Sequence, residues 1–432
     1  MKKRTGNSVR KSKTTVRKRR PIVQYIVHAK PPEKVIMMDQ DPYTPRLPVR
    51  IHQRDLRALM VIDQFNVGGT ETHVLACVRE LLRRGVHVAV AGKRGEMRDA
   101  FAALGCPIYE IDFVTKEYER NMQEEENIVS RLKEIMSIEG INMIHAHQMP
   151  SGYFAIKAGE PLRVPMVFTV HGRYHENDAE LLRKFNAVVC VSPSLRKYLP
   201  SKLASFVIPN GIDTVQYSER PIMHDDLRKE LGIDGKSPVF MFAGRLSWEK
   251  ADICKDTIEA CKRLKTEKYP DLQLLIAGEG HHSQDIRNLV EDVHRELGES
   301  FIHMLGNTLY LSPYYSICDG VIGTGRTAIE TLACCRPLIA IGVKGFFGNV
   351  TPSNYEAAWD SWFGDHYATE KWSVDRIKDS LKQILESPLH EKKEQGWVGR
   401  NLVKEHFNIT RTTDQLLDLY ARIMDGRYTM SG

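Results

Sequence analysis

The chain has 432 residues, of which 42% are hydrophobic and 27% are charged, and its formal net charge is +6. This length and composition predict two or three globular domains and exclude a wholly disordered or fibrous chain. The chain has neither the roughly 18 to 20 consecutive apolar residues that a membrane span needs nor the pattern of a secretory signal, so we expect a cytoplasmic protein.

The positive charge is concentrated at the N-terminus. Residues 1–20 contain ten Lys and Arg side chains and no acidic ones, which leaves a net charge of −4 on the rest of the chain. Together with the prolines of residues 1–54, this predicts a basic, largely disordered tail and lead-in. Such a tail suits peripheral contact of residues 1–20 with an anionic membrane or another polyanion, and a solubilising arm without a partner is the alternative. We expect no specific nucleic acid partner.

From Leu56 onward, short apolar runs alternate with amphipathic helical segments. Runs such as ALMVID, VHVAVAG, MIHAH and PMVFTVHG predict strands that are buried on both faces, and segments such as THVLACVRELLRRG predict the helices between them. This repeated strand–helix–strand pattern predicts an α/β fold with a parallel sheet covered on both sides. Eight scattered cysteines, several of them within apolar runs, indicate reduced core residues rather than a disulfide framework.

The same pattern restarts after a polar bridge, so we predict two doubly wound, Rossmann-like domains facing each other across a cleft. The predicted boundaries are a tail at 1–54, a first domain at 55–215, a linker at 216–235, a second domain at 236–404, and a C-terminal helix within 405–432 that packs back toward the first domain. Ligands of such folds bind beyond the carboxyl ends of the strands, so the cleft is the expected site.

Two motifs of the first half follow strands of this kind. In VIDQFNVGGTETHV, Gly68 and Gly69 precede a helix whose first N–H groups favour an anion, although any tight turn into a helix also suits glycine. In VFTVHG, His171 follows a strand and can act on a substrate hydroxyl, with a structural role as the alternative. His145 and His147 are spaced for a metal, but no acidic or Cys partner lies nearby in sequence, so we expect none.

Three motifs of the second half also follow strands. FAGRLSWEKA places Arg245 and Lys250 after Gly244. Two cations at the edge of a cleft suit a diphosphate, and the alternative is a solvated loop with ordinary surface charges. LLIAGEGH ends in a glycine turn. DGVIGTGRTAIETLACC leads from a glycine-rich turn into a helix with Glu330, whose carboxylate can accept hydrogen bonds from ribose hydroxyls.

With these five motifs in this order, residues 56 to 425 resemble the retaining, nucleotide-sugar-dependent glycosyltransferases of family 4 (glycosyl transferases group 1), which have the GT-B fold. The carriers are GGTETHV, TVHG, VSPSLRKYL with VIPNGID, AGRLSWEKA, AGEG and AIETLACCRPLIA. The resemblance implies transfer of a sugar from a nucleoside diphosphate sugar to a glycan, lipid or surface acceptor, as in cell-envelope or surface polysaccharide synthesis. It implies no cofactor besides this co-substrate and no metal. The first domain would bind the acceptor and the second the nucleotide sugar.

The resemblance also implies roles for individual residues. Gly69 would place its amide near the donor phosphate, and His171 would contact the transferred sugar. The implied catalytic residues are His171, Arg245 and Lys250, and the implied donor-binding residues are Gly68, Gly69, Gly244, Gly278, Glu279, Thr324, Gly325, Arg326, Thr327 and Glu330. Arg245 and Lys250 would neutralise the leaving diphosphate, Gly278 and Glu279 would line the base pocket, and Glu330 would hold the ribose.

The chain departs from the family pattern at one position. The family has two glutamates separated by seven residues, and the position of the first is occupied by Ile322. Either the amides of Thr324 and Gly325 replace the missing carboxylate or activity is reduced. Arg326, where an apolar residue is usual, would add a third cation near the phosphates or cap the surface. The alternatives to an active transferase are therefore a catalytically weak or inactive scaffold that binds nucleotide, and another GT-B activity such as an epimerase or phosphorylase.

Overall fold

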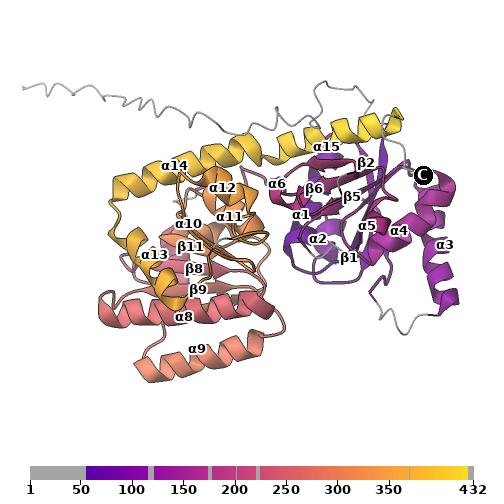
Figure 1. Ribbon diagram of the computed structural model, residues 1–432. Coiled ribbons are helices and arrows are strands. Elements are labelled where there is room, and N and C mark those ends of the chain that lie inside the picture. Colours follow the sequence, from indigo (N-terminus) through magenta and orange to yellow (C-terminus); the bar gives the residue numbers. More distant parts are fainter. Residues whose placement is uncertain are drawn as a thin grey trace, which may run out of the picture. The chain divides into compact units, whose positions relative to one another are not determined.

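The computed structural model of the protein describes residues 55–114, 121–173, 178–200, 202–219, 224–368 and 370–426 (Figure 1). These residues belong to one compact unit. The predicted basic tail at 1–54 lies outside them. No helix in this described part combines the length and the apolarity that crossing a bilayer requires.

The first half of the described chain is built on a seven-stranded parallel sheet in the order β3-β2-β1-β4-β5-β6-β7. Its strands are β1 (Arg57–Gln64), β2 (His87–Lys93), β3 (Ile108–Glu110), β4 (Met143–Ala146), β5 (Met166–Val170), β6 (Ala187–Cys190) and β7 (Ser205–Val207). Its helices are α1 (Gly69–Arg83), α2 (Arg98–Ala102), α3 (Met122–Ile138), α4 (Ser151–Gly159), η3 (Glu160–Leu162), α5 (Ala179–Leu182) and α6 (Pro193–Arg196).

Strand β1 shows why the apolar runs form a sheet that is covered on both faces. Successive side chains of a strand point to opposite faces. Leu59 and Val61 pack in one core cluster, whereas Met60 and Ile62 pack in the other, and all four are almost fully buried. A strand with two apolar faces therefore requires helices on both sides, as the sequence predicts.

The second half has a six-stranded sheet in the order β10-β9-β8-β11-β12-β13. Its strands are β8 (Val239–Ala243), β9 (Gln273–Ala277), β10 (Ile302–Gly306), β11 (Gly320–Gly323), β12 (Leu338–Gly342) and β13 (Gly345–Val350). Its helices are α7 (His224–Glu230), α8 (Trp248–Glu267), α9 (Ser283–Leu297), α10 (Ser312–Ile317), α11 (Gly325–Ala333), α12 (Tyr355–Asp360) and α13 (Val374–Glu386). The prediction of a purely parallel sheet is wrong at the edge, where β13 pairs antiparallel with β12 after a short turn.

The single helix predicted over 405–425 is present, and a separate helix precedes it. Helix α14 (Leu389–His406) ends just before α15 (Ile409–Met424) begins (Figure 1). The break lies at Asn408, whose side chain accepts a hydrogen bond from the Thr410 N–H at 2.9 Å and so caps α15. Leu416 and Tyr420 of α15 pack with Val74 of α1, so the last helix covers part of the first sheet's helical layer.

The eight cysteines are free thiols, and all but the half-buried Cys335 are buried. Burial raises the pKa of Cys77 and of Cys190 to about 12. Because the thiolate is the reactive form, such groups are inert core residues at neutral pH, as their apolar sequence context predicts.

Candidate functional site

A pocket of about 570 Å³ lies where loops that follow strands of the two sheets come together. Loops after β1 and β5 of the first sheet and after β8, β9, β11 and β12 of the second contribute to it. All of the predicted site residues line this one pocket: Gly68, Gly69, His171, Gly244, Arg245, Lys250, Gly278, Glu279, Thr324, Gly325, Arg326, Thr327 and Glu330. The structure therefore brings residues that are up to 262 positions apart into one cavity, while their roles remain predictions.

The two glycines at the start of α1 differ in their surroundings. Gly69 lines the pocket and has no atom within 4 Å of the place where a side chain would begin, so a ligand can approach the start of α1 there. A side chain at Gly68 would instead collide with the carboxylate of Glu71, at 2.3 Å, and approach the guanidinium of Arg245 at 3.0 Å. Gly69 thus fits the predicted approach of an anion to the helix start, whereas Gly68 makes room for Glu71.

Glu71 is a buried carboxylate that the sequence analysis did not select. It is 4% exposed and accepts a hydrogen bond from the Gln148 amide at 2.8 Å. Burial raises its pKa, while the Gln148 hydrogen bond and the charge of Arg245 act in the opposite direction. Glu71 is therefore a buried acidic group whose charge interacts with that of Arg245 at the edge of the pocket.

Lys250 is held by a second acidic residue, Asp365. The Lys250 ammonium lies 3.2 Å from one carboxylate oxygen of Asp365, and the other oxygen accepts from the Val343 N–H at 3.3 Å. Burial alone would raise the pKa of Asp365, but the charge of Lys250, the neighbouring His366 and these hydrogen bonds hold it below its ordinary value. Asp365 is therefore an ionised carboxylate in the pocket, and it belongs to none of the predicted motifs.

The turn after β9 is shaped by Gly278. Its φ of +133° lies in a region that side chains disfavour, and a Cβ there would lie 2.0 Å from the Gly244 carbonyl oxygen. Glycine is thus needed for the close approach of the β8 and β9 loops. The adjacent Glu279 pairs with Arg287 at 3.0 Å, so its carboxylate is fixed at the pocket wall rather than free in solvent.

Helix α11 begins against the segment that carries Asp365. The Thr324 hydroxyl donates to the carbonyl oxygens of Trp362 at 3.0 Å and Phe363 at 2.9 Å. Gly325 has φ of +56°, and a Cβ there would lie 2.8 Å from the Trp362 indole nitrogen. The start of α11 is therefore locked to the Trp362 loop, which places Asp365 beside the predicted phosphate-binding amides.

Arg326 and Glu330 form a buried ion pair one helical turn apart. The Arg326 Nε lies 2.8 Å from a Glu330 oxygen, and their side chains are 10% and 7% exposed. The other Glu330 oxygen accepts from the Tyr315 hydroxyl at 3.1 Å, and Arg326 also donates to the Gly211 carbonyl at 3.2 Å. The alternative that Arg326 caps the surface is wrong, because its guanidinium is buried and paired.

Burial raises the pKa of Glu330, and its ion pair with Arg326 and the hydroxyls of Tyr217 and Tyr315 counteract part of that rise. Glu330 lines the pocket, as expected for a ribose-binding group. Its carboxylate is nevertheless shared with Arg326 and both tyrosines, so a ribose would meet a preorganised network rather than a free carboxylate.

Ile322, at the position of the missing glutamate, is a core residue. It lies within β11, is fully buried, and packs in the cluster that covers one face of the second sheet. Its neighbours in the sheet are Phe242 and Ile339. In this fold a carboxylate at this position would have to be buried among apolar side chains.

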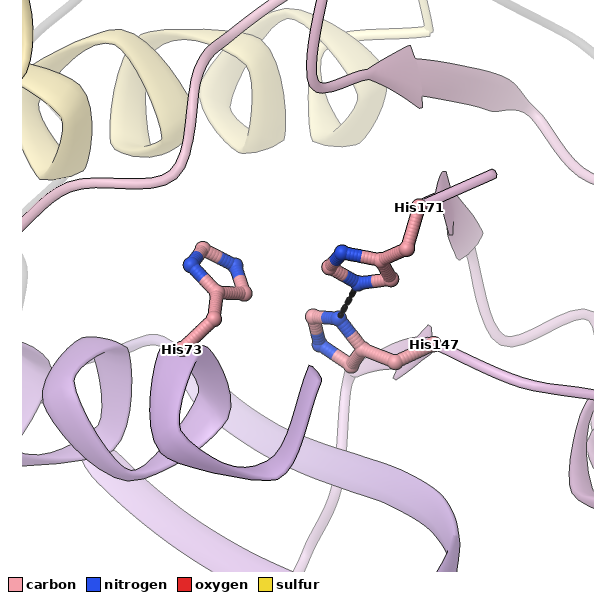
Figure 2. Close-up of side chains that lie close together, drawn as sticks. All are labelled: His73, His147 and His171. Atoms are coloured by element: carbon pink, nitrogen blue, oxygen red, sulfur yellow. Dashed lines mark hydrogen bonds between the residues drawn. The ribbon is translucent and has the colours of Figure 1, made fainter. Parts of the chain in front are cut away.

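Three histidines from separate elements lie close together, as Figure 2 shows: His73 of α1, His147 after β4 and His171 after β5, of which His171 also lines the pocket. The ring nitrogens of His147 and His171 lie 3.3 Å apart. Burial lowers the pKa of His147 well below its ordinary value, and that of His73 likewise, so both rings are neutral at physiological pH.

His366 connects the His171 loop with the second sheet's half. Its Nε2 lies 3.1 Å from the His171 carbonyl oxygen, and its Nδ1 lies 2.8 Å from the Ser192 hydroxyl. Burial lowers the pKa of His366 to about 4, so the ring is neutral. Because a carbonyl can only accept, Nε2 carries the proton and Nδ1 accepts from Ser192.

The fold is shared with known glycosyltransferases. A crystal structure of a glycosyltransferase from Rickettsia africae superimposes with a TM-score of 0.68 at 17% identity, covering 86% of this chain and 99% of that one. The Anabaena protein Alr3699/HepE in complex with UDP and glucose gives a TM-score of 0.66 at 15% identity, covering 85% and 99%. The two sheets and their helices thus form the GT-B fold that the sequence predicts.

Family comparisons extend this assignment from the fold to the sequence. Residues 67–216 match glycosyltransferase family 4, and residues 223–397 match glycosyl transferases group 1. An α-maltose-1-phosphate synthase of Mycolicibacterium smegmatis is 22% identical over 68% of this chain and 82% of its own. A lipopolysaccharide 1,2-N-acetylglucosaminetransferase of Salmonella typhimurium is 23% identical over 65% and 75%. The chain belongs to the family 4, group 1 glycosyltransferases.

Proposed function

We propose that the protein is a retaining glycosyltransferase that moves a sugar from a nucleoside diphosphate sugar to a glycan, lipid or surface acceptor, in cell-envelope or surface polysaccharide synthesis. The observation that carries this proposal is the convergence of Arg245, Lys250 and the starts of α1 and α11 on one pocket. Cations and helix-start amides in one cavity suit a diphosphate. Structural neighbours crystallised with UDP and UDP-glucose support a uridine nucleotide as the first donor to test.

In this proposal the protein acts mainly by stabilising the departing diphosphate. Negative charge develops on that group as the bond to the sugar breaks, and fixed cations lower the barrier without reorganising. Lys250 is held by Asp365 at 3.2 Å, and Arg245 lies close enough to the buried Glu71 for their charges to interact. His171 lies at the pocket wall for contact with the transferred sugar. Transfer itself needs no metal ion in this scheme.

The proposal is tested by turnover of UDP, GDP and ADP sugars, with the anomeric configuration of the product read by NMR. We expect one nucleotide class to be consumed and the product to keep the donor's configuration. Consumption with inverted configuration would contradict the retaining mechanism. Failure of every nucleotide sugar to bind or react would overturn the proposal in favour of another GT-B activity, and phosphorolysis without a nucleotide sugar would identify a phosphorylase.

The inactive scaffold remains the second candidate because Ile322 replaces the first glutamate. The position of Asp365 argues against that candidate, because it supplies a carboxylate to the pocket. It brings an ionised carboxylate to the pocket beside Lys250 and the Thr324 turn, from a loop that packs on the start of α11. We therefore propose that Asp365 supplies the carboxylate function that Ile322 cannot, by holding Lys250 and accepting from donor sugar hydroxyls.

Replacing Asp365 by Asn is expected to lower kcat/KM for the donor about 10- to 100-fold, which corresponds to about 1.4 to 2.7 kcal/mol. The amide keeps the shape but loses the charge that holds Lys250. Steady-state kinetics with the donor found above measure the effect, and most of it should fall on kcat. Asp360→Asn is the matched control, because Asp360 pairs with Lys197 outside the pocket. Unchanged kinetics in Asp365→Asn would refute the carboxylate role.

A second proposal concerns residues 1–20, whose ten basic side chains suit peripheral contact with an anionic membrane surface. Each such charge near an anionic surface is worth about 1 kcal/mol. We expect a variant lacking residues 1–20 to lose sedimentation with anionic lipid vesicles while its turnover on a soluble acceptor is unchanged. Sedimentation of the full chain should also weaken at high salt. Equal sedimentation of both chains, or a fall in soluble turnover, would contradict this division of roles.

A further inference from the structure

The histidine cluster defined by His73, His147 and His171 lies where three separate elements converge. One ring nitrogen of each residue lies within 4.8 Å of one nitrogen of each other residue. The His147 and His171 nitrogens are 3.3 Å apart. Figure 2 shows the three rings gathered around a common space, with His73 facing the other two.

Buried nitrogen atoms in the cluster lack partners. Within the described ranges, the His147 Nε2 and the His73 Nδ1 are buried and have no hydrogen-bond partner. His147 itself is fully buried. An unpaired polar atom in such a position costs free energy, and a ligand that binds there removes the cost. The hydrogen bond between the His147 Nδ1 and the His171 Nε2 leaves the His73 Nδ1, on the third side of the cluster, without a partner.

We propose that His73, His147 and His171 form a binding site for a divalent transition-metal ion of the zinc type, with a fourth coordination position open to solvent or ligand. Zinc takes imidazole nitrogens at about 2.0 to 2.1 Å in tetrahedral geometry, which sets the ligand atoms about 3.4 Å apart. The His147 Nδ1 and the His171 Nε2, which lie 3.3 Å apart, already match this spacing and are the ligand atoms of this proposal, so the unpaired Nε2 of His147 is not one of them. The remaining separations, at most 4.8 Å, would shorten through side-chain rotation.

His171 also lines the pocket, so a bound ion would fix its ring at the pocket wall. The site is distinct from the phosphate-binding groups, because Arg245, Lys250 and the start of α11 do not contribute ligands to it. Metal binding can therefore be measured without a nucleotide sugar, and its outcome is independent of whether the protein transfers sugars.

The test uses untagged, full-length protein that has been treated with a chelator and dialysed. Calorimetric titration with Zn²⁺ should show one equivalent bound with a dissociation constant of about 1 μM or tighter. Titration with Co²⁺ should produce the intense visible absorption of a tetrahedral nitrogen-ligated ion. Absence of binding, or an octahedral cobalt spectrum, would overturn the proposal.

Variants identify the ligands. His73→Ala should weaken Zn²⁺ binding by at least about 100-fold, since losing a ligand costs more than losing a supporting group. His147→Gln should do the same, and far-UV circular dichroism checks that each variant is folded. His390→Ala is the matched control, because His390 is exposed on α14 away from the cluster. Unchanged binding in folded His73→Ala, or equal loss in His390→Ala, would assign the metal to another place.

Discussion

Replacing Lys250 by Ala is expected to lower kcat for sugar transfer by about 100- to 1,000-fold, or about 2.7 to 4 kcal/mol of transition-state stabilisation. Lys250 lies at the start of α8, is held by Asp365 at 3.2 Å, and lines the pocket together with Arg245. Its ammonium is already oriented before the reaction, so its charge acts mainly on the diphosphate that develops in the transition state. Steady-state kinetics at saturating donor measure the loss.

Two further variants on this site sharpen the prediction for Lys250. Lys250→Arg keeps the positive charge but not the compact ammonium, so we expect an intermediate rate. Lys255→Ala is the matched control on the same helix, since Lys255 is half-buried and pairs with Asp252 outside the pocket. A fall of less than about tenfold in Lys250→Ala, or a comparable fall in Lys255→Ala, would contradict the assigned role.

Replacing Glu330 by Ala is expected to destabilise the protein by about 3 to 5 kcal/mol. The change leaves the Arg326 guanidinium, whose side chain is 10% exposed, without its partner at 2.8 Å. It also removes the acceptor of the Tyr315 hydroxyl. The midpoint of urea unfolding, followed by circular dichroism, reports the loss.

The double variant Glu330→Ala with Arg326→Met separates the cost of an unpaired charge from the cost of lost packing. Because it removes both charges, we expect it to be more stable than Glu330→Ala alone. Equal stability of the single variant and the original chain would show that solvent in the pocket already screens Arg326. Equal destabilisation of the single and double variants would show that packing, not the ion pair, accounts for the effect.

The fold and most of the pocket could be predicted because they rest on one regular feature of the sequence. Each of the motifs with Gly68, His171, Arg245, Gly278 and Thr324 directly follows an apolar run. Parallel strands in a sheet have their carboxyl ends on the same edge. Assigning the strands is therefore enough to place these residues along the same edges of the sheets. Hydrophobic periodicity does not give the distances between them.

Asp365 and His366 could not be predicted in the same way. Their segment follows no strand of the parallel pattern, and its place against Thr324 depends on tertiary packing of Trp362 and Phe363. Glu71 lies in α1, where an acidic residue in the first turn is typical of any helix. Burial decides its role, and burial is not visible in the local sequence.

The histidine cluster shows a further limit of spacing arguments. The sequence analysis sought a partner for His145 and His147 close to them in the chain. The structure instead brings His73 from α1 and His171 from the neighbouring strand β5 to His147. Because β4 pairs with β5, residues just after these two strands lie together, so the proximity of His171 to His147 could have been predicted from the strand order. The position of His73 on the inner face of α1 was not predictable from its amphipathic pattern alone.

The most direct measurement of the central claim is the thermal stability of the full chain with UDP, GDP and ADP, compared between the original protein and the Lys250→Ala and Lys255→Ala variants. A nucleotide at 100 times its dissociation constant stabilises the fold by about 2.7 kcal/mol. We predict that one nucleotide raises the melting temperature of the original protein and of Lys255→Ala but not of Lys250→Ala at the same concentration. No shift with any nucleotide, or equal shifts in all three proteins, would contradict a diphosphate site at this pocket.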